Sequence, residues 1–355
     1  MKSITVKSAT KNYQVFFEEN PKILLQNLIR TENAIFVIDR NVHEQYNVLF
    51  QTIDESKKSI IDVSENRKNM DMVLELYSLV LEKSIKRNFT LISIGGGITQ
   101  DVTGFVASTL FRGIKWIYIP TTLLAQSDSC IGSKTSLNYK DYKNLIGTFY
   151  PPDNIYICTE FLNSLSNSDY LSGMGEVVKL NILAGEENIL KMKNTPKFFD
   201  QDNKNLSDVI FEALMIKKDY IESDELDKGR RNYLNYGHCF GHAIEFESQY
   251  QVPHGQAVVM GMILANIVSF NRNELSFEKE EFLRKEILAK LLPNELLRYQ
   301  FNKKAIANAM KKDKKREGTD LPLILIDDKY RPSRINDLKI DEVYNSLDKY
   351  ESLFR

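Results

Sequence analysis

Histidine is scarce in this chain, and three of its four copies fall in one short stretch: His238, His242 and His254. In Gly-His238-Cys-Phe-Gly-His242, a helix would place two imidazoles one turn apart on one face. That spacing favours metal binding by both, as in helical HxxxH zinc sites. His254, within Pro-His-Gly, is expected at the start of the next helix. A lone histidine is more often a core residue, but this clustering predicts metal binding or acid–base chemistry.

Glu176 is the carboxylate that could join such a site. It lies in Gly-Met-Gly-Glu-Val-Val-Lys, and Lys179 follows it by about one helical turn. A carboxylate oxygen is an ordinary zinc ligand beside imidazole nitrogens. Taken alone, the pair favours the alternative, a solvated Glu–Lys pair on the surface of a helix.

A second candidate site is the glycine-rich segment Gly95-Gly96-Gly97-Ile-Thr-Gln-Asp101-Val-Thr-Gly104. It lies between a predicted buried strand and a predicted helix. Glycines there would let backbone N–H groups approach a pyrophosphate at the helix N-terminus. Thr121 and Thr122 follow the next strand, again at a carboxyl end, where α/β sheets bind ligands. The segment is not the standard GxGxxG, and a tight structural turn is the alternative.

Several cations lie beside glycine, asparagine or histidine instead of in helical faces of alternating charge. They are Arg112, Lys134, Lys143, Lys179, Lys217, Arg231 and Lys314. Each alone would be assigned to the solvated surface. The run of charged residues from Lys311 to Arg316 is also typical of a solvated surface segment. Together they indicate a pocket for an anionic substrate such as a phosphate or a carboxylate.

Composition limits the function classes. Lys+Arg 47 against Asp+Glu 48 gives a net charge of −1, without the basic excess typical of nucleic-acid binders. The three cysteines are widely spaced without a CxxC pair, which indicates a reducing compartment. The N-terminal segment alternates like a strand and lacks the apolar core of a signal peptide. No segment is long and apolar enough to span a bilayer. We therefore expect a soluble, cytoplasmic protein with no nucleic-acid or membrane partner.

The elements that must position these residues change character along the chain. Buried strands are predicted at Ala34–Asp39, Phe89–Ile94 and Trp116–Ile119, and a helix at Met70–Ile85. This alternation predicts an open, Rossmann-like α/β sheet in the first half. From about Asp169 onward the pattern is helical, over Leu206–Ile221, Cys239–Gln249, Ala257–Phe270 and Glu278–Leu292. The chain of 355 residues is thus expected to form an α/β domain over residues 1–167 and a mostly α-helical domain over residues 168–355.

Several long segments, in this order, resemble the 3-dehydroquinate synthase family. They are GGGITQDVTGFVASTLFRG (95–113), PTTLLAQSDSCIGSKTSLN (120–138), KNLIGTFYPP (143–152), GMGEVVK (173–179), RRNYLNYGHCFGHAIE (230–245) and PHG (253–255). The resemblance implies an NAD-binding first domain, a second domain that binds metal and substrate, a divalent metal (zinc, or cobalt), and a homodimer. It also implies a substrate that is a seven-carbon keto sugar acid phosphate. The family's NAD is recycled within each turnover, so the net reaction releases phosphate without net oxidation.

The resemblance also implies roles for individual residues. The implied metal ligands are Glu176, His238 and His254, which moves His242 from the metal to the substrate pocket. The implied NAD contacts are Asp39, Asn41, Glu65, Lys68, Gly96, Gly97, Asp101, Thr121, Thr122, Leu124 and Lys143. The implied substrate-binding and catalytic residues are Asp128, Lys134, Asn144, Lys179, Lys217, Arg231, Asn235, His242 and Lys314, with Arg112 reaching the phosphate across the dimer interface.

Three alternatives remain open at this point. Related cyclases act on sedoheptulose 7-phosphate and tend to replace the residues kept here as Asn235 and His242. Gly132-Ser133, Leu180 and Ile98-Thr99-Gln100 depart from the family's usual residues, which leaves a paralogue with an altered substrate open. A metal-dependent polyol dehydrogenase of similar fold would not need the phosphate-binding cations. A non-catalytic relative would not need to keep the three implied metal ligands.

Overall fold

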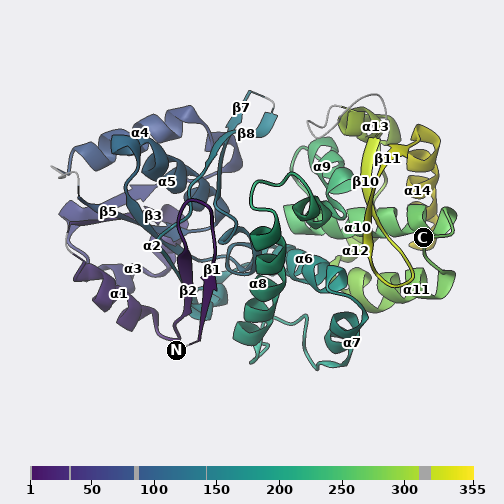
Figure 1. The fold of residues 1–355 in the computed structure, drawn as a ribbon, viewed down its shortest axis with the longest axis horizontal. Coiled ribbons are helices and arrows are strands. Elements are labelled where there is room, and N and C mark those ends of the chain that lie inside the picture. The colour runs from purple at the N-terminus through teal and green to yellow at the C-terminus, as the bar shows by residue number, and fades with distance from the viewer. Residues whose placement is uncertain (1, 32, 84–87, 141, 312–320) are drawn as a thin grey trace. The chain divides into compact units, whose positions relative to one another are not determined.

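A computed structural model of the chain describes residues 2–31, 33–83, 88–140, 142–311 and 321–355 (Figure 1). The chain divides into two compact units. The first unit contains Met1–Leu165 together with Ile210–Glu225, and the second contains Ser166–Val209 together with Leu226–Arg355. The first unit therefore includes most of a helix that the sequence pattern assigned to the C-terminal domain.

The first unit is built on a sheet of seven strands among the residues described here. Their order is β1 (Ser3–Val6), β2 (Tyr13–Phe17), β9 (Asn154–Ile157), β6 (Lys115–Pro120), β5 (Thr90–Gly95), β3 (Ala34–Asp39) and β4 (Lys58–Ile61). Only the β1–β2 pair is antiparallel. The buried strands β3, β5 and β6 agree with the three predicted strands within one residue at each end, and the parallel α/β sheet is confirmed.

Helices cover both faces of this sheet, as Figure 1 shows for the first unit. They include α1 (Pro21–Ile29), α2 (Arg40–Gln45), α3 (Asn47–Phe50), α4 (Met70–Leu81) and α5 (Gly97–Thr109). Phe36 and Ile38 of β3 pack against Leu24 of α1 and Phe50 of α3 in one apolar core. On the opposite face, α4 and α5 pack against the sheet and against one another. Burial on both faces explains why the strands are continuously apolar.

A two-stranded ribbon and two further helical segments complete the first unit. The ribbon pairs β7 (Lys134–Tyr139) with β8 (Tyr142–Phe149) and packs against α5. The segment Ala125–Ser129 forms a short π-helix after β6. Helix α8 (Leu206–Ser223) belongs to this unit from Ile210 to its C-terminal end.

The second unit is mostly helical, as predicted. Its helices are α6 (Asn167–Leu183), α7 (Glu186–Asn194), α9 (His238–Glu247), α10 (His254–Asn271), α11 (Phe277–Phe282), α12 (Asn294–Leu297), α13 (Lys303–Lys311) and α14 (Ile340–Leu353). An antiparallel pair, β10 (Leu321–Ile326) and β11 (Pro332–Leu338), accompanies them. Helix α10 is buried from Gly255 to Ser269 on all its faces, and it packs against α6, α9 and α14.

One predicted helix is not continuous. The pattern over Glu278–Leu292 predicts one helix, but α11 ends at Phe282 and is followed by a π-helical turn (Leu283–Ile287) and a 3₁₀ turn (Leu288–Leu291). Ile287 leaves helical geometry, with φ −122° and ψ −68°. This change of pitch lets Ile287, Leu288 and Leu291 all lie in the core.

Two expectations from composition can be compared with the structure. Cys130, Cys158 and Cys239 are all free thiols, in agreement with the absence of a disulfide framework. Among the described residues, no helix combines the length and apolar character that a bilayer span requires.

Candidate functional site

Three side chains from three helices of the second unit converge on one point. Glu176 lies in α6, and His238 and His254 are the first residues of α9 and α10. Glu176 Oε1 lies 3.5 Å from His238 Nε2 and 3.3 Å from His254 Nε2. The three ligand atoms lie within 4.8 Å of one another, and Glu176 is almost fully buried. One carboxylate oxygen and two imidazole nitrogens are a donor set that is also found in catalytic zinc sites, where the fourth position stays open.

The helices can bring these residues together because two glycines lie where α6 and α10 cross. A Cβ atom on Gly255 would lie 1.7 Å from the carbonyl oxygen of Ser172. A Cβ atom on Gly175 would lie 2.4 Å from the carbonyl oxygen of Gly255. Only glycine permits so close a backbone approach. Glu176 and His254 are the chain neighbours of these glycines, so the crossing itself sets the distance between them.

We therefore predict that Gly255→Ala weakens metal binding as well as folding. The added methyl group must push α10 away from α6, which moves His254 away from Glu176. We expect the free energy of unfolding to fall by about 1–3 kcal/mol, the usual effect of overpacking. Chemical denaturation and zinc competition with a chromophoric chelator measure the two effects. An unchanged zinc affinity in the folded variant would show that the crossing does not set the ligand geometry.

The electrostatics of the cluster favour a cation. Burial raises the pKa of Glu176, but the ammonium group of Lys179 and the His254 imidazole outweigh it and lower that pKa. Lys179 forms an ion pair with Glu176 Oε2 and is itself buried. Burial lowers the pKa of His254, while the carboxylates of Glu245 and Glu176 raise it more strongly. Neither oxygen of the buried Glu176 carboxylate has a hydrogen bond of ordinary geometry among the described residues, so Oε1 remains available to a metal.

His242 lies beside this cluster, one turn along α9 from His238. Its ring centroid lies 5.3 Å from that of His238 and 6.0 Å from that of His254. His242 is exposed, and together with Glu245 and His254 it forms a second group of side chains that could hold a metal. The structure thus brings together both the HxxxH pair and the set Glu176, His238 and His254. Glu176 Oε1, however, faces His238 and His254, which favours that set as the ligands.

Arg231 and Asn235 precede α9 in a 3₁₀ turn over Arg230–Asn235. Arg231 is buried, and Asn235 donates from Nδ2 to the carbonyl oxygen of Asn232 at 2.9 Å. A buried guanidinium that keeps its charge is suited to bind a carboxylate through two hydrogen bonds. The structure therefore places these two predicted substrate residues in the same unit as the Glu–His–His cluster.

In the first unit, the predicted NAD residues gather at the carboxyl edge of the parallel sheet. Asp39 ends β3 and accepts a hydrogen bond from the Asn41 backbone N–H at 2.9 Å. Gly96 ends the turn after β5 as the N-cap of α5. The Thr121 backbone N–H donates to the Gly95 carbonyl oxygen at 3.0 Å, which ties the end of β6 to the end of β5. This edge presents a helix N-terminus and backbone donors, as required for binding a pyrophosphate.

The remaining predicted NAD residues on this edge are Gly97, Thr122 and Leu124. Gly97 is the first residue of α5. Thr122 Oγ1 accepts a hydrogen bond from the Ala125 backbone N–H at 3.2 Å, and Leu124 directly precedes the π-helix. Thr122 thus fixes the start of the segment that leads to Asp128.

A polar network links the β7–β8 ribbon to α5 and to the loop before α4. Lys68 forms an ion pair with Asp101 and donates to Asn144 Oδ1 at 2.7 Å. Ser136 donates to Asp101 from both its backbone N–H and its hydroxyl group, at 3.0 and 2.9 Å. Burial raises the pKa of Asp101, and Lys68 and Ser136 partly offset that rise. Nearby, Glu65 Oε1 accepts from Asn138 Nδ2 at 2.9 Å and lies 3.9 Å from Lys143 Nζ.

We predict that Lys68→Met destabilises the first unit by about 2–3 kcal/mol, because it leaves the Asp101 carboxylate without its cation in a largely buried position. Chemical denaturation measures the change. Lys11→Met is the matched control, because the Lys11–Asp153 ion pair is 31% exposed at both side chains and such pairs contribute about 1 kcal/mol or less. Equal effects of the two variants would show that the Lys68 network does not stabilise this unit.

Other predicted cations lie in the same unit. Lys217 of α8 is buried, forms an ion pair with Asp128 Oδ1 at 2.9 Å and donates to the Asp128 carbonyl oxygen at 2.7 Å. Lys134, at the start of β7, is exposed, and so is Arg112, which lies in left-handed backbone geometry at φ 65°. Lys314 lies outside the described residues.

The three departures from the family pattern are accommodated within their own units. Gln100 donates to the Ser129 carbonyl oxygen at 2.8 Å and accepts from the Ser129 hydroxyl group at 2.7 Å. Ser133 has a left-handed φ of 64°, and its hydroxyl group donates to Glu225 Oε1 at 3.2 Å. Leu180 is fully buried in α6. Gln100 and Ser133 thus have hydrogen-bond partners within the first unit, and Leu180 packs in the core of the second.

Two features of the second unit were not recognised in the sequence. The buried Glu245 carboxylate lies 3.1 Å from His254 Nδ1 (Oε2 to Nδ1), and the Tyr236 carbonyl oxygen lies 3.3 Å from His238 Nδ1. An acidic residue at helical spacing from Gly241 and next to Ile244, both buried, was the available signal. A backbone carbonyl gives no signal in a sequence.

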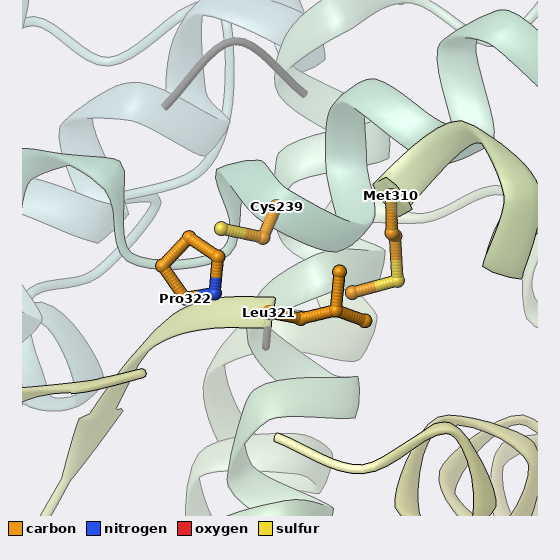
Figure 2. A pocket seen from close by; sticks show the side chains of 4 residues that line it. All are labelled: Cys239, Met310, Leu321 and Pro322. Atoms are coloured by element: carbon orange, nitrogen blue, oxygen red, sulfur yellow. The ribbon is translucent and has the colours of Figure 1, made fainter. Parts of the chain in front are cut away.

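The second unit also has a small hollow beside α9, which Figure 2 shows. It is lined by Cys239 from α9, Met310 from α13, and Leu321 and Pro322 from β10. None of these four described residues carries a charged side chain.

Comparison with known proteins identifies the family of this chain. The family model for the N-terminal domain of 3-dehydroquinate synthase matches residues 58–172. The model for the C-terminal domain of the same family matches residues 173–316. A 3-dehydroquinate synthase from Pelagibacter ubique (strain HTCC1062) is 36% identical over 338 residues, which cover 91% of each chain.

Two solved structures are similar over nearly the whole chain, at identities that show the fold alone. The 2-epi-5-epi-valiolone synthase from Streptomyces hygroscopicus subsp. jinggangensis 5008, with NAD⁺ and Zn²⁺ bound, has a TM-score of 0.85 at 22% identity and covers 98% of this chain and 99% of its own. A 2-deoxy-scyllo-inosose synthase complexed with carbaglucose-6-phosphate, NAD⁺ and Co²⁺ has a TM-score of 0.84 at 23% identity, covering 98% of this chain and 100% of its own. The family-model and sequence matches show that the chain belongs to the 3-dehydroquinate synthase family.

Proposed function

We propose that this chain converts 3-deoxy-D-arabino-heptulosonate 7-phosphate to 3-dehydroquinate and inorganic phosphate, with NAD that is recycled in each turnover. The observation that carries the proposal is the convergence of Glu176, His238 and His254 beside the buried Lys179. Such a three-ligand set is typical of catalytic metal sites. The family membership supports the same reaction. We further propose residues 1–167 as the NAD-binding domain and residues 168–355 as the domain that binds metal and substrate.

Glu176, His238 and His254 would hold a divalent cation, zinc or cobalt. When bound, the cation supplies Lewis acidity toward a substrate hydroxyl group and the carbonyl group derived from it. The donor set fits this role, because all three ligand atoms face one point and Glu176 Oε1 has no hydrogen bond of ordinary geometry there. The two similar solved structures hold Zn²⁺ or Co²⁺, which supports the choice of metal.

The carboxyl edge of the first unit's sheet would hold NAD. When bound, NAD⁺ supplies a hydride acceptor, and NADH returns the hydride later in the turnover. Backbone donors around Gly96 and Gly97 would bind the pyrophosphate at the N-terminus of α5. Asp39 at the end of β3 would bind a ribose hydroxyl group, as acidic residues do in related dinucleotide sites. The polar network of Lys68, Asp101 and the β7–β8 ribbon would hold these loops in place.

The cations and amides would bind the anionic ends of the substrate. We assign the substrate carboxylate to the buried Arg231, because a guanidinium binds a carboxylate with paired hydrogen bonds. Asn235 and His242 would orient the same end of the sugar. Lys134, Lys217, Asn144 and Lys314 would bind the phosphate and the hydroxyl groups, with Asp128 fixing the ammonium group of Lys217. The leaving phosphate itself would accept the proton that is removed during elimination.

We also propose that the chain acts as a homodimer in the cytoplasm. Arg112 is exposed in a left-handed turn at the end of α5, where its side chain is free to extend beyond its own unit. In the dimer it would reach the phosphate bound by the partner subunit. Sedimentation equilibrium would measure the oligomeric state.

The decisive experiment is phosphate release with NAD⁺ and zinc or cobalt. Two substrates are compared in parallel: 3-deoxy-D-arabino-heptulosonate 7-phosphate and sedoheptulose 7-phosphate. We expect release from the first alone, without accumulation of NADH. Release from the second alone would make the chain a specialised cyclase. NADH formation from a simple polyol would make it a dehydrogenase, and protein that binds no zinc or cobalt would point to a non-catalytic relative.

A further inference from the structure

We propose that Glu245 is a positioning residue for the metal centre, which acts by holding the His254 ring through its outer nitrogen. Glu245 Oε2 lies 3.1 Å from His254 Nδ1. The inference rests on the metal-binding part of the proposed function. Glu245 would touch neither the metal nor the substrate, but it would fix the orientation of the His254 ring, one of the proposed metal ligands.

The contact defines the protonation of the imidazole. An ionised carboxylate can only accept hydrogen bonds, so Nδ1 must carry the proton and donate to Glu245. In the neutral ring, the lone pair then lies on Nε2, the nitrogen that faces Glu176 Oε1 at 3.3 Å. Glu245 therefore selects the tautomer that can bind a metal, and it turns the ring toward the other ligands.

The second imidazole is held in the same way by a neutral group. His238 Nδ1 lies 3.3 Å from the Tyr236 carbonyl oxygen, which can only accept. The hydroxyl group of Tyr236 donates to Asn266 Oδ1 of α10, so this carbonyl belongs to an anchored residue. In both rings, therefore, Nε2 lies toward Glu176 Oε1, and Nδ1 contacts an acceptor on the other side of the ring. His254 Nδ1 faces a carboxylate, whereas His238 Nδ1 faces a backbone carbonyl oxygen.

The burial of Glu245 requires such a partner. Its side chain is 6% exposed, on a helix face that also buries Phe240 and Ile244. A buried carboxylate is strongly destabilising unless it is paired and hydrogen-bonded. His254 Nδ1 supplies a partner on the neighbouring helix. An apolar residue would pack here at lower cost, so the carboxylate is explained by its contact with His254.

The test compares Glu245→Gln and Glu245→Ala with the wild type. Zinc affinity is measured by competition with a chromophoric chelator, and the Co²⁺-substituted proteins are compared by visible absorption. We expect Glu245→Ala to lower zinc affinity by about 10–100-fold, the usual effect of losing an outer-shell partner. Glu245→Gln keeps an acceptor oxygen and should lose less, with a shifted Co²⁺ spectrum. Its nearly identical shape keeps the test valid even if the alanine variant does not fold.

Glu247→Gln is the matched control on the same helix. Among the described residues, the Glu247 carboxylate accepts hydrogen bonds from the Tyr299 hydroxyl group and the Asn302 backbone N–H. Its zinc affinity and Co²⁺ spectrum should equal those of the wild type.

Two results would overturn the positioning role while leaving the metal site intact. One is wild-type zinc affinity and an unchanged Co²⁺ spectrum in both Glu245 variants. The other is complete loss of zinc from Glu245→Gln while Glu176→Gln still binds it, which would make Glu245 a ligand. Failure of the proposed function itself is a different result, namely wild-type zinc binding after Glu176→Ala.

Discussion

Glu176→Ala should lose the metal and, with it, turnover. The variant removes the buried oxygen that faces both His238 Nε2 and His254 Nε2. Outer-shell partners change metal affinity by about 10–100-fold, so loss of a ligand should exceed about 100-fold. The change also leaves Lys179 buried without its ion-pair partner, which should lower the free energy of unfolding by about 3 kcal/mol. Zinc content by mass spectrometry, phosphate release and denaturation measure these effects.

Two further variants separate metal loss from unfolding. Glu176→Gln keeps the volume of the side chain but removes its charge, so it should lose zinc while remaining folded. Asp169→Asn is the matched control in the same helix, because Asp169 lies in the first turn of α6 and accepts a hydrogen bond from Ser166. It should keep both zinc and activity. Full metal content and activity in Glu176→Ala would remove Glu176 from the ligand set.

His242→Ala should reduce turnover while zinc content stays near that of the wild type. His242 is exposed, and its ring lies beside those of His238 and His254, whose Nε2 atoms lie 3.5 and 3.3 Å from Glu176 Oε1. Loss of a group that orients substrate or transfers a proton typically lowers the rate by about 100-fold or more. Its exposure implies a change in unfolding free energy within about 0.5 kcal/mol. The measurements are kcat/KM for phosphate release and zinc content on the same preparation.

The remaining histidine provides the control. His43 of α2 stacks on Phe50 at a ring-centroid distance of 5.8 Å, and it belongs to the first unit. His43→Ala should keep the wild-type kcat/KM. Loss of zinc from His242→Ala would instead identify the HxxxH pair of α9 as the metal ligands.

The sequence by itself determined the fold class and most of the candidate site. Strands buried on both faces are continuously apolar, which identified β3 as Ala34–Asp39 without error. The clustered histidines identified the metal-binding region, and Pro253 before His254 marked the start of α10. Long motifs in a fixed order then identified the family.

Periodicity was less reliable where the core required a change of helical pitch. The pattern over Glu278–Leu292 has helical spacing, but spacing does not reveal the break at Ile287. It also did not show that Ile210–Glu225 belongs to the first unit, since a helix pattern does not identify the surface against which the helix packs.

Only the tertiary structure decided how the site is assembled. The spacing of His238 and His242 favours a local pair, because sequence patterns report neighbours along one helix. The structure instead places Glu176 Oε1 of α6 near His238 of α9 and His254 of α10, and Gly175 and Gly255 permit the close approach of α6 and α10. The packing of α9 against α10 places Glu245 against His254. Contacts between helices depend on their separation and angle, and these follow from packing that no single segment of sequence encodes.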